Sequence, residues 1–188
     1  MRASSMTTRY VGTGDGSWHG DWYVYVPSIT DRITAARWAQ TIEDRHAASR
    51  VRGGYGNPGR GRIDWQVRGI LGEIAGLFPI GQGPALSSKN WRGTADFGQL
   101  EVRTTSWMAL RGGSERWPTL AGWPVMARDI RDGLLIIAVE DRGDDFAVMG
   151  CLPARRAQLL DVPLGGVVAV VYPDALEDLA SAYASGDA

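Results

Sequence analysis

The strongest constraint on the fold is a run of six apolar residues, Leu134–Val139, set between Gly133 and Glu140. A run this short favours a strand over a helix, and it leaves no polar position to face water. Strands of this kind lie in sheets that are covered on both faces. Together with the helical patterns elsewhere in the chain, the run predicts an α/β fold in which helices flank a central mixed sheet.

The clearest helical pattern precedes this strand and ends at Pro79. Its apolar positions recur at helical spacing, at Val67, Ile70, Leu71, Ile74, Ala75 and Phe78. Another side of the same helix carries Gly69, Gly72 and Gly76, and Glu73 lies beside this row. Because an interior glycine lowers helix stability by about 1 kcal/mol relative to alanine, the row indicates that another element packs very close to the helix.

Shorter patterns predict the remaining elements. Thr30 is expected to cap a helix that starts at Asp31 and runs to about Arg50, with an apolar stripe at Ile33, Ala36, Ala39 and Ile42. Further strands are expected at 22–26, 95–97, 100–105, 146–152 and 167–172, helices at 153–159 and 173–183, a turn at 12–16, and connecting segments at 80–94 and 106–125. We expect a single domain over residues 1–188, with a core at about 29–172, an N-terminal extension at 1–28 and a frayed tail at 184–188.

Composition excludes several kinds of site. The single cysteine, Cys151, excludes an intramolecular disulfide, and the two histidines lie far apart in the sequence without other ligands at zinc spacing. Neither a nucleophile elbow nor a phosphate-binding P-loop is present. The chain has no apolar run of membrane-spanning length and no apolar segment in its first residues, so we expect a cytoplasmic protein without a membrane partner.

Four polar residues form the pattern that carries chemistry. Glu73 lies on the amphipathic helix, Asp96 accompanies a short strand, and Glu101 and Arg103 share one face of the next strand because strand side chains alternate. Each residue also has an ordinary interpretation: an exposed helix carboxylate, a turn aspartate, and a surface ion pair worth less than about 1 kcal/mol. The ordered set favours a shared site over three separate coincidences.

In this order the residues resemble the motif of the PD-(D/E)XK nuclease superfamily, especially its small phage-type members. The family pattern is a helical glycine–glutamate pair, an aspartate, and glutamate-x-lysine on an adjacent strand. Here the matching positions are Gly72 with Glu73, Asp96, and Glu101 with Val102 and Arg103. The resemblance extends over about residues 29–160 and implies a restriction-endonuclease-like core.

The resemblance implies a nuclease that depends on Mg²⁺ or Mn²⁺ and hydrolyses DNA with metal-activated water. Asp96 and Glu101 would bind the metal together with the main-chain carbonyl of Val102, and Glu73 would bind through water or a second metal. Arg103 departs from the family pattern, in which lysine is more usual. Arginine stays protonated and cannot be a general base, but it can orient water and donate to a phosphate.

The DNA-binding surface is expected to include four arginines: Arg52, Arg60, Arg62 and Arg68. Residues 31–68 hold eight arginines against four acids, and the glycine-rich loop at 52–62 could close over a phosphate backbone or be an ordinary surface loop. Two alternatives stay open. One is a catalytically silent nuclease-fold protein that binds DNA or protein. The other is an assembly component that uses the tryptophan-rich segment from Trp107 to Trp123, and a homodimer is compatible with either.

Overall fold

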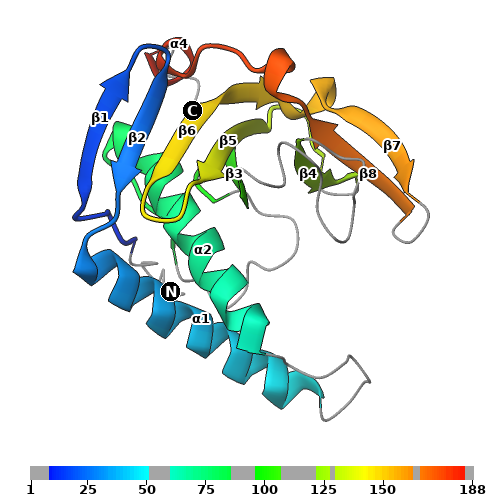
Figure 1. The fold of residues 1–188 in the computed structure, drawn as a ribbon. Coiled ribbons are helices and arrows are strands. Elements are labelled where there is room, and N and C mark those ends of the chain that lie inside the picture. The colour runs from blue at the N-terminus through cyan, green and yellow to red at the C-terminus, as the bar shows by residue number, and fades with distance from the viewer. Residues whose placement is uncertain are drawn as a thin grey trace, which may run out of the picture.

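The computed structural model describes residues 9–50, 60–85, 96–106, 122–127, 130–162 and 166–184. Within these ranges the chain forms two sheets and two long helices (Figure 1). In chain order the elements are β1 (Asp15–His19), β2 (Trp22–Val26), α1 (Ile29–Arg50), α2 (Arg60–Leu77), β3 (Leu100–Ser106), β4 (Trp123–Met126), β5 (Leu135–Asp141), β6 (Phe146–Pro153), β7 (Gln158–Val162), β8 (Gly166–Val171) and α4 (Leu179–Ala184). Short 3₁₀ turns follow α2, β6 and β8, at Phe78–Ile80, Ala154–Arg156 and Pro173–Ala175.

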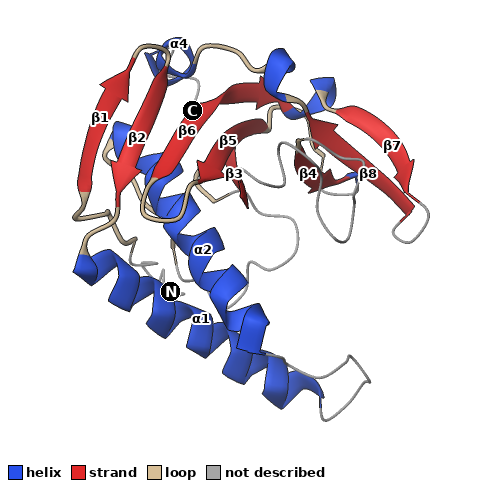
Figure 2. Ribbon diagram, in the orientation of Figure 1, coloured by secondary structure: helices blue, strands red, loops and turns tan. Residues whose placement is uncertain are grey.

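The larger sheet has five strands in the order β1-β2-β6-β5-β3. β3 runs parallel to β5, whereas the other neighbours are antiparallel, so the sheet is mixed. The three-stranded sheet, β4-β8-β7, is antiparallel and lies to one side of the larger sheet (Figure 2). The predicted α/β class with a mixed sheet is therefore confirmed.

Each face of the five-stranded sheet has its own core. Alternation along β5 sends Ile137 and Val139 into the core shared with α2, and Ile136 and Ala138 into the core shared with Trp123 of β4. The 134–139 run is thus a strand covered on both faces, as its composition predicts. Figure 1 shows α2 running across one face of the sheet, with α1 crossing α2 in turn.

The first turn of α1 is a capping box. Ser28 Oγ accepts the Asp31 N–H at 3.1 Å, and Asp31 Oδ2 accepts the Ser28 N–H at 2.7 Å. The helix therefore begins at Ile29, and the prediction that Thr30 caps it is wrong. The predicted stripe is also displaced: Ile33 is 46% exposed, and the buried row is Asp31, Ala35, Ala39 and Glu43. The alanines in this row leave room for α2 to pack.

Several other expected elements differ from the structure. Residues 153–159 hold a 3₁₀ turn and the start of β7 instead of a helix, and residues 173–183 hold a 3₁₀ turn separated from α4. β1 and β4 occupy segments that were expected to be a turn and an irregular connection. Residues 60–62 belong to α2 and not to the preceding loop. β2 pairs with β6, and β1 pairs with β2, so the sheet reaches back into the segment expected to be an extension.

None of the helices in the described part of the chain has the length and apolarity that a membrane crossing requires.

Candidate functional site

The site is built on β3, which lies at one edge of the five-stranded sheet and pairs only with β5 among the described residues. Asp96 precedes this strand, and its Oδ2 accepts the Val102 N–H at 2.7 Å. Between them the chain turns tightly, with Phe97 and Leu100 exchanging backbone hydrogen bonds at 3.1 and 2.6 Å. The N–H and C=O of one strand residue point to the same side. The Val102 carbonyl therefore faces the same edge as the Asp96 carboxylate.

Glu101 and Arg103 lie on one face of β3, as predicted from strand alternation. Their register partners on β5 are Ile136 and Ala138, which places both side chains on the face turned toward the three-stranded sheet. Arg103 Nη2 contacts Glu101 Oε1 at 2.5 Å, and these side chains are 32% and 12% exposed. Arg103 Nε is buried without a hydrogen-bond partner in the described part of the chain. One N–H donor of this guanidinium is thus available inside the site.

Glycines bring α2 onto β3 and so position Glu73. A methyl group built on Gly72 would lie 1.9 Å from Thr104 Oγ1, and one on Gly76 would lie 2.9 Å from a Val102 methyl. The predicted close approach is therefore confirmed at these two positions. At Gly69 a methyl would meet nothing within 4 Å, so the approach does not extend one turn earlier. Glu73 follows Gly72 directly and is half-buried.

The electrostatics link the three carboxylates. Burial raises the pKa of Glu73 well above its usual range, and the nearby charges of Asp96 and Glu101 raise it further, while Arg103 opposes them. Burial also raises the pKa of Asp96 to about 6, against the lowering effects of the Val102 N–H and Arg103. Like charges from α2 and from the β3 segment thus act on one another, and the Arg103 guanidinium opposes this effect.

These residues have the chemistry of a hard-cation site, although their present arrangement is not a finished ligand set. No group of three or more His, Cys, Asp or Glu side chains among the described residues is arranged to hold a metal ion. Glu101 is engaged with Arg103 instead. Three carboxylates and one guanidinium would carry a net charge of −2 when all are ionised, which a divalent cation would neutralise.

The four arginines predicted to bind DNA are placed very differently. Arg52 lies outside the described residues, and Arg60 and Arg62 lie in the first turn of α2 with side chains that are not described. Arg68 lies farther along α2 and makes a bidentate ion pair with Asp141 at the end of β5. The segment from Trp107 to residue 121 also lies outside the described residues, whereas Trp123 is buried in β4.

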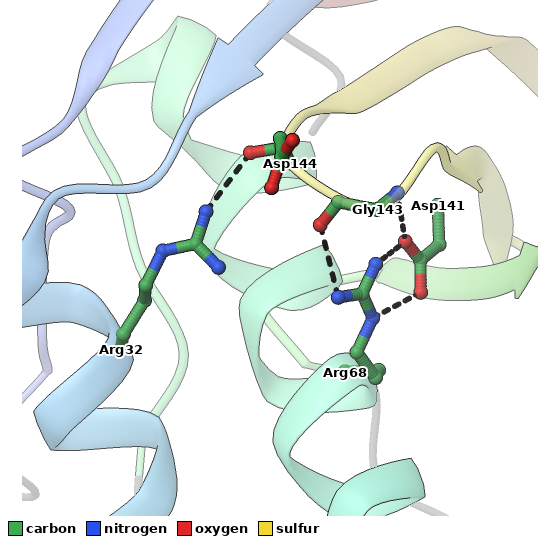
Figure 3. A network of polar contacts seen from close by, with 5 residues as sticks. All are labelled: Arg32, Arg68, Asp141, Gly143 and Asp144. Carbon is green, nitrogen blue, oxygen red and sulfur yellow. Dashed lines mark hydrogen bonds and ion pairs between the residues drawn. The ribbon is translucent and has the colours of Figure 1, made fainter.

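Arg68 and Arg32 hold the turn between β5 and β6 against the helices (Figure 3). Arg68 Nη1 donates to the Gly143 carbonyl at 2.9 Å, and Arg32 Nη2 of α1 donates to the Asp144 carbonyl at 3.0 Å. Asp141 Oδ1 in turn accepts the Gly143 N–H at 2.9 Å. The Arg68 guanidinium is thus engaged within the protein, and its predicted contact with DNA remains a prediction.

Sequence reasoning missed one residue beside the site, Arg9. Its guanidinium contacts the main chain at Asp96, which is 87 positions away in the sequence. No local pattern marks Arg9, because the contact depends on how the chain folds back onto the end of α2. A lone arginine ahead of a glycine-rich segment carries no periodicity from which to predict it.

Comparisons with protein-family models, with curated proteins and with solved structures give no match for this chain. The α/β class and the mixed sheet follow from the structure itself. The geometry and charge of the β3 edge are therefore the basis for any statement about function.

Proposed function

We propose that this chain is a divalent-metal-dependent nuclease of the PD-(D/E)XK type that hydrolyses DNA at the open edge of β3. One observation carries the proposal. The helix that carries Glu73 packs directly on β3 at Gly72 and Gly76. Burial raises the pKa of Glu73, and the charges of Asp96 and Glu101 of the β3 segment raise it further. Their order along the chain is also that of the family motif. A restriction-endonuclease-like core is part of the same proposal.

The uncompensated charge supports a cation at this edge. Asp96 and Glu101 would hold Mg²⁺ or Mn²⁺ with the Val102 carbonyl, and Glu73 would complete the set directly or through water. When bound, such a cation supplies a nucleophilic water near neutral pH and relieves charge on the phosphate. Without a cation, burial raises the pKa of both Glu73 and Asp96, and the charges of Asp96 and Glu101 raise the pKa of Glu73 further, so proton uptake reduces the negative charge.

The chain's own residues then have separate tasks. The Val102 N–H fixes the orientation of the Asp96 carboxylate. Arg103 holds Glu101 by one terminal nitrogen. Its Nε–H has no partner among the described residues and can donate to a non-bridging phosphate oxygen. Because arginine remains protonated, Arg103 stabilises charge and orients water and does not accept the proton of the attacking water.

Glu101→Gln tests the proposal with Glu177→Gln as the matched control. Both changes neutralise a glutamate that pairs with an arginine, but the Arg156–Glu177 pair lies on an exposed surface, with side chains 54% and 45% exposed. We expect the unaltered protein to cleave plasmid and linear DNA with Mg²⁺ or Mn²⁺, and chelation to stop it. Glu101→Gln should lose at least about 100-fold in rate, and Glu177→Gln should retain it. Undiminished cleavage by Glu101→Gln would refute the proposal.

A catalytically silent relative of the nucleases is the second candidate, and one observation favours it. Arg103 stands where lysine is more usual, and it occupies the carboxylate that would bind metal. Calorimetric titration with Mn²⁺ separates the two candidates. A nuclease site should bind the ion and release protons from Glu73 and Asp96, the two carboxyls whose pKa values are raised. A silent binding protein should give no heat of Mn²⁺ binding at this site.

A further inference from the structure

Arg9 reaches the proposed site from the N-terminal side of the chain. Its Nη1 lies 3.1 Å from the Asp96 carbonyl oxygen and 3.3 Å from the Gly83 carbonyl oxygen. The guanidinium carbon also lies 4.6 Å from the centre of the Phe97 ring, in a cation–π contact. One side chain thus binds the residue that carries the carboxylate and stacks on the residue after it.

The backbone holds Arg9 in this position. Arg9 forms an isolated antiparallel bridge with Ala85, and the Tyr10 N–H donates to the Pro84 carbonyl at 3.0 Å. The segment at 83–85 follows the 3₁₀ turn at the end of α2. Arg9 therefore ties the Asp96 segment to the chain that leaves α2, the helix that carries Glu73.

Asp96 is held from its other side by β3. The Phe97 and Leu100 backbones pair, and the Asp96 carboxylate accepts the Val102 N–H. A residue fixed at its main-chain carbonyl, at the ring of its neighbour and at its own side chain has little freedom to turn away from the edge. We propose that Arg9 is a positioning residue that aims the Asp96 carboxylate at the open edge of β3, where the metal is proposed to bind.

This role suits arginine and not lysine. A guanidinium is planar and can share its N–H groups between two carbonyl oxygens while its face lies on an aromatic ring. A lysine ammonium at the same place is a point charge with no face to stack. Groups that orient metal ligands in this way are typically worth about 10- to 100-fold in metal affinity.

The test uses Arg9→Ala and Arg9→Lys, with Arg142→Ala as the matched control. Arg142 also lies over an aromatic ring, 5.3 Å from the centre of Trp22, and pairs with Glu140, but at the turn between β5 and β6. The first readout needs no metal and no activity: hydrogen exchange of the Val102 amide in chelator-treated full-length protein. We expect this exchange to rise about 10-fold or more in Arg9→Ala, less in Arg9→Lys, and not at all in Arg142→Ala.

A double-mutant comparison separates positioning from general loosening. If Arg9 acts through Asp96, then Arg9→Ala should add little to Val102 exchange in an Asp96→Ala background. Mn²⁺ affinity should fall about 10- to 100-fold in Arg9→Ala. Val102 exchange and Mn²⁺ affinity that match those of the unaltered protein would overturn the inference, as would additive effects of Arg9→Ala and Asp96→Ala.

The role of Arg9 in metal binding rests on the proposed function, and the two can fail separately. If the unaltered protein takes up no Mn²⁺ and cleaves no DNA, the nuclease proposal fails. The Val102 exchange measurement still decides whether Arg9 positions Asp96. If the unaltered protein binds Mn²⁺ and Arg9→Ala binds it equally well, only the inference about Arg9 fails.

Discussion

At the scale of single residues, Asp31 does more than begin a helix. Its side chain is fully buried and accepts hydrogen bonds from Tyr10 Oη at 2.7 Å, Tyr25 Oη at 2.8 Å, and the main-chain N–H groups of Thr13 at 2.9 Å and Ser28 at 2.7 Å. Burial raises the pKa of Asp31, but these donors outweigh it and hold the pKa below its usual value. One carboxylate thus joins the segment before β1, the strand β2 and the start of α1.

We predict that Asp31→Asn destabilises the protein by about 2–4 kcal/mol at pH 7, because an amide cannot accept on both sides and places N–H groups against donors. The lowered pKa means that the ionised form stabilises the fold above the ordinary carboxyl pKa, and that this part is lost as the pH falls through the folded pKa. In urea titrations between pH 7 and pH 2, the free energy of unfolding should therefore fall less steeply with decreasing pH in Asp31→Asn than in the unaltered protein.

The control for this prediction is Asp44→Asn, which alters an exposed carboxylate on the same helix. Among the described residues, Asp44 accepts a side-chain hydrogen bond from Gln40 at 2.7 Å along α1. Its replacement should change the free energy of unfolding by less than about 0.5 kcal/mol. If both variants lose the same free energy of unfolding, the hydrogen bonds around Asp31 add no stability beyond the effect of a negative charge on the helix.

At the scale of elements, the glycine row of α2 decides how close the helix lies to β3. Gly72 and Gly76 lie over Thr104 and Val102, whereas Gly69 faces open space. The same residue type therefore has opposite consequences at positions three residues apart. Intrinsic helix propensity favours alanine at all three positions. Any loss of stability in Gly72→Ala therefore reports the contact of the helix with the sheet.

We predict that Gly69→Ala raises the free energy of unfolding by up to about 1 kcal/mol. Gly72→Ala should lower it by about 1–3 kcal/mol, because the new methyl would overlap the Thr104 side chain and displace the helix. The two variants control one another in denaturant titrations. Gly72→Ala should also weaken Mn²⁺ binding, since displacement of α2 moves Glu73. A neutral Gly72→Ala would show that the helix and the strand are not in close contact.

The sequence pattern correctly predicted those elements whose burial in the fold matches their local spacing of apolar residues. The strands at Leu135–Asp141 and Phe146–Pro153 and the buried face of α2 follow from runs and spacing that burial enforces. β7 was missed because Pro153 favours a helix start, and only pairing with β8 makes Gln158–Val162 a strand. β1 was missed because the glycines at 12, 14 and 16 favour a turn, although Gly16, the one glycine of β1, leaves room for the Tyr23 side chain.

The candidate site shows the same division. Glu101 and Arg103 share a face of β3, as strand alternation predicts, and Gly72 and Gly76 make the close approach that the glycine row predicts. That the approaching element is β3 was not predicted. The contact of Asp96 with Val102 and the contact of Arg9 with Asp96 depend on tight or distant returns of the chain that spacing does not encode. The pairing of Glu101 with Arg103 is the ordinary interpretation that strand alternation allows. The engagement of Arg68 by Asp141 could not be predicted from charge runs.

At the scale of the whole molecule, the Arg68–Asp141 pair joins the helical layer to the sheet. The side chains are 33% and 11% exposed, and Arg68 also lies 5.3 Å from the centre of the Phe146 ring. Together with Arg32 on the Asp144 carbonyl, the pair secures one turn of the sheet to both long helices (Figure 3). Partial burial and two-point geometry make such a pair stronger than an exposed one.

We predict a coupling of about 1–2 kcal/mol between Arg68→Ala and Asp141→Asn in a double-mutant cycle of unfolding free energies. The exposed Arg156–Glu177 pair is the matched control and should give less than about 1 kcal/mol. If Arg68 instead serves mainly as a DNA contact, Arg68→Ala should leave stability unchanged and reduce DNA affinity, with a smaller salt dependence. The cycle and a filter-binding titration together decide between these two roles.

β3 pairs with a single strand, β5, among the described residues, and the two run in parallel. A parallel partner cannot be reached by a tight hairpin, so the chain must travel back along the sheet before β5 begins, and it forms β4 on the way. During synthesis, β3, which carries Glu101 and Arg103, therefore lacks its partner strand until β5 has left the ribosome. A nascent chain that ends before β5 would carry Glu73, Asp96, Glu101 and Arg103 without the strand that pairs with β3, so the proposed site assembles only after β5 has been synthesised.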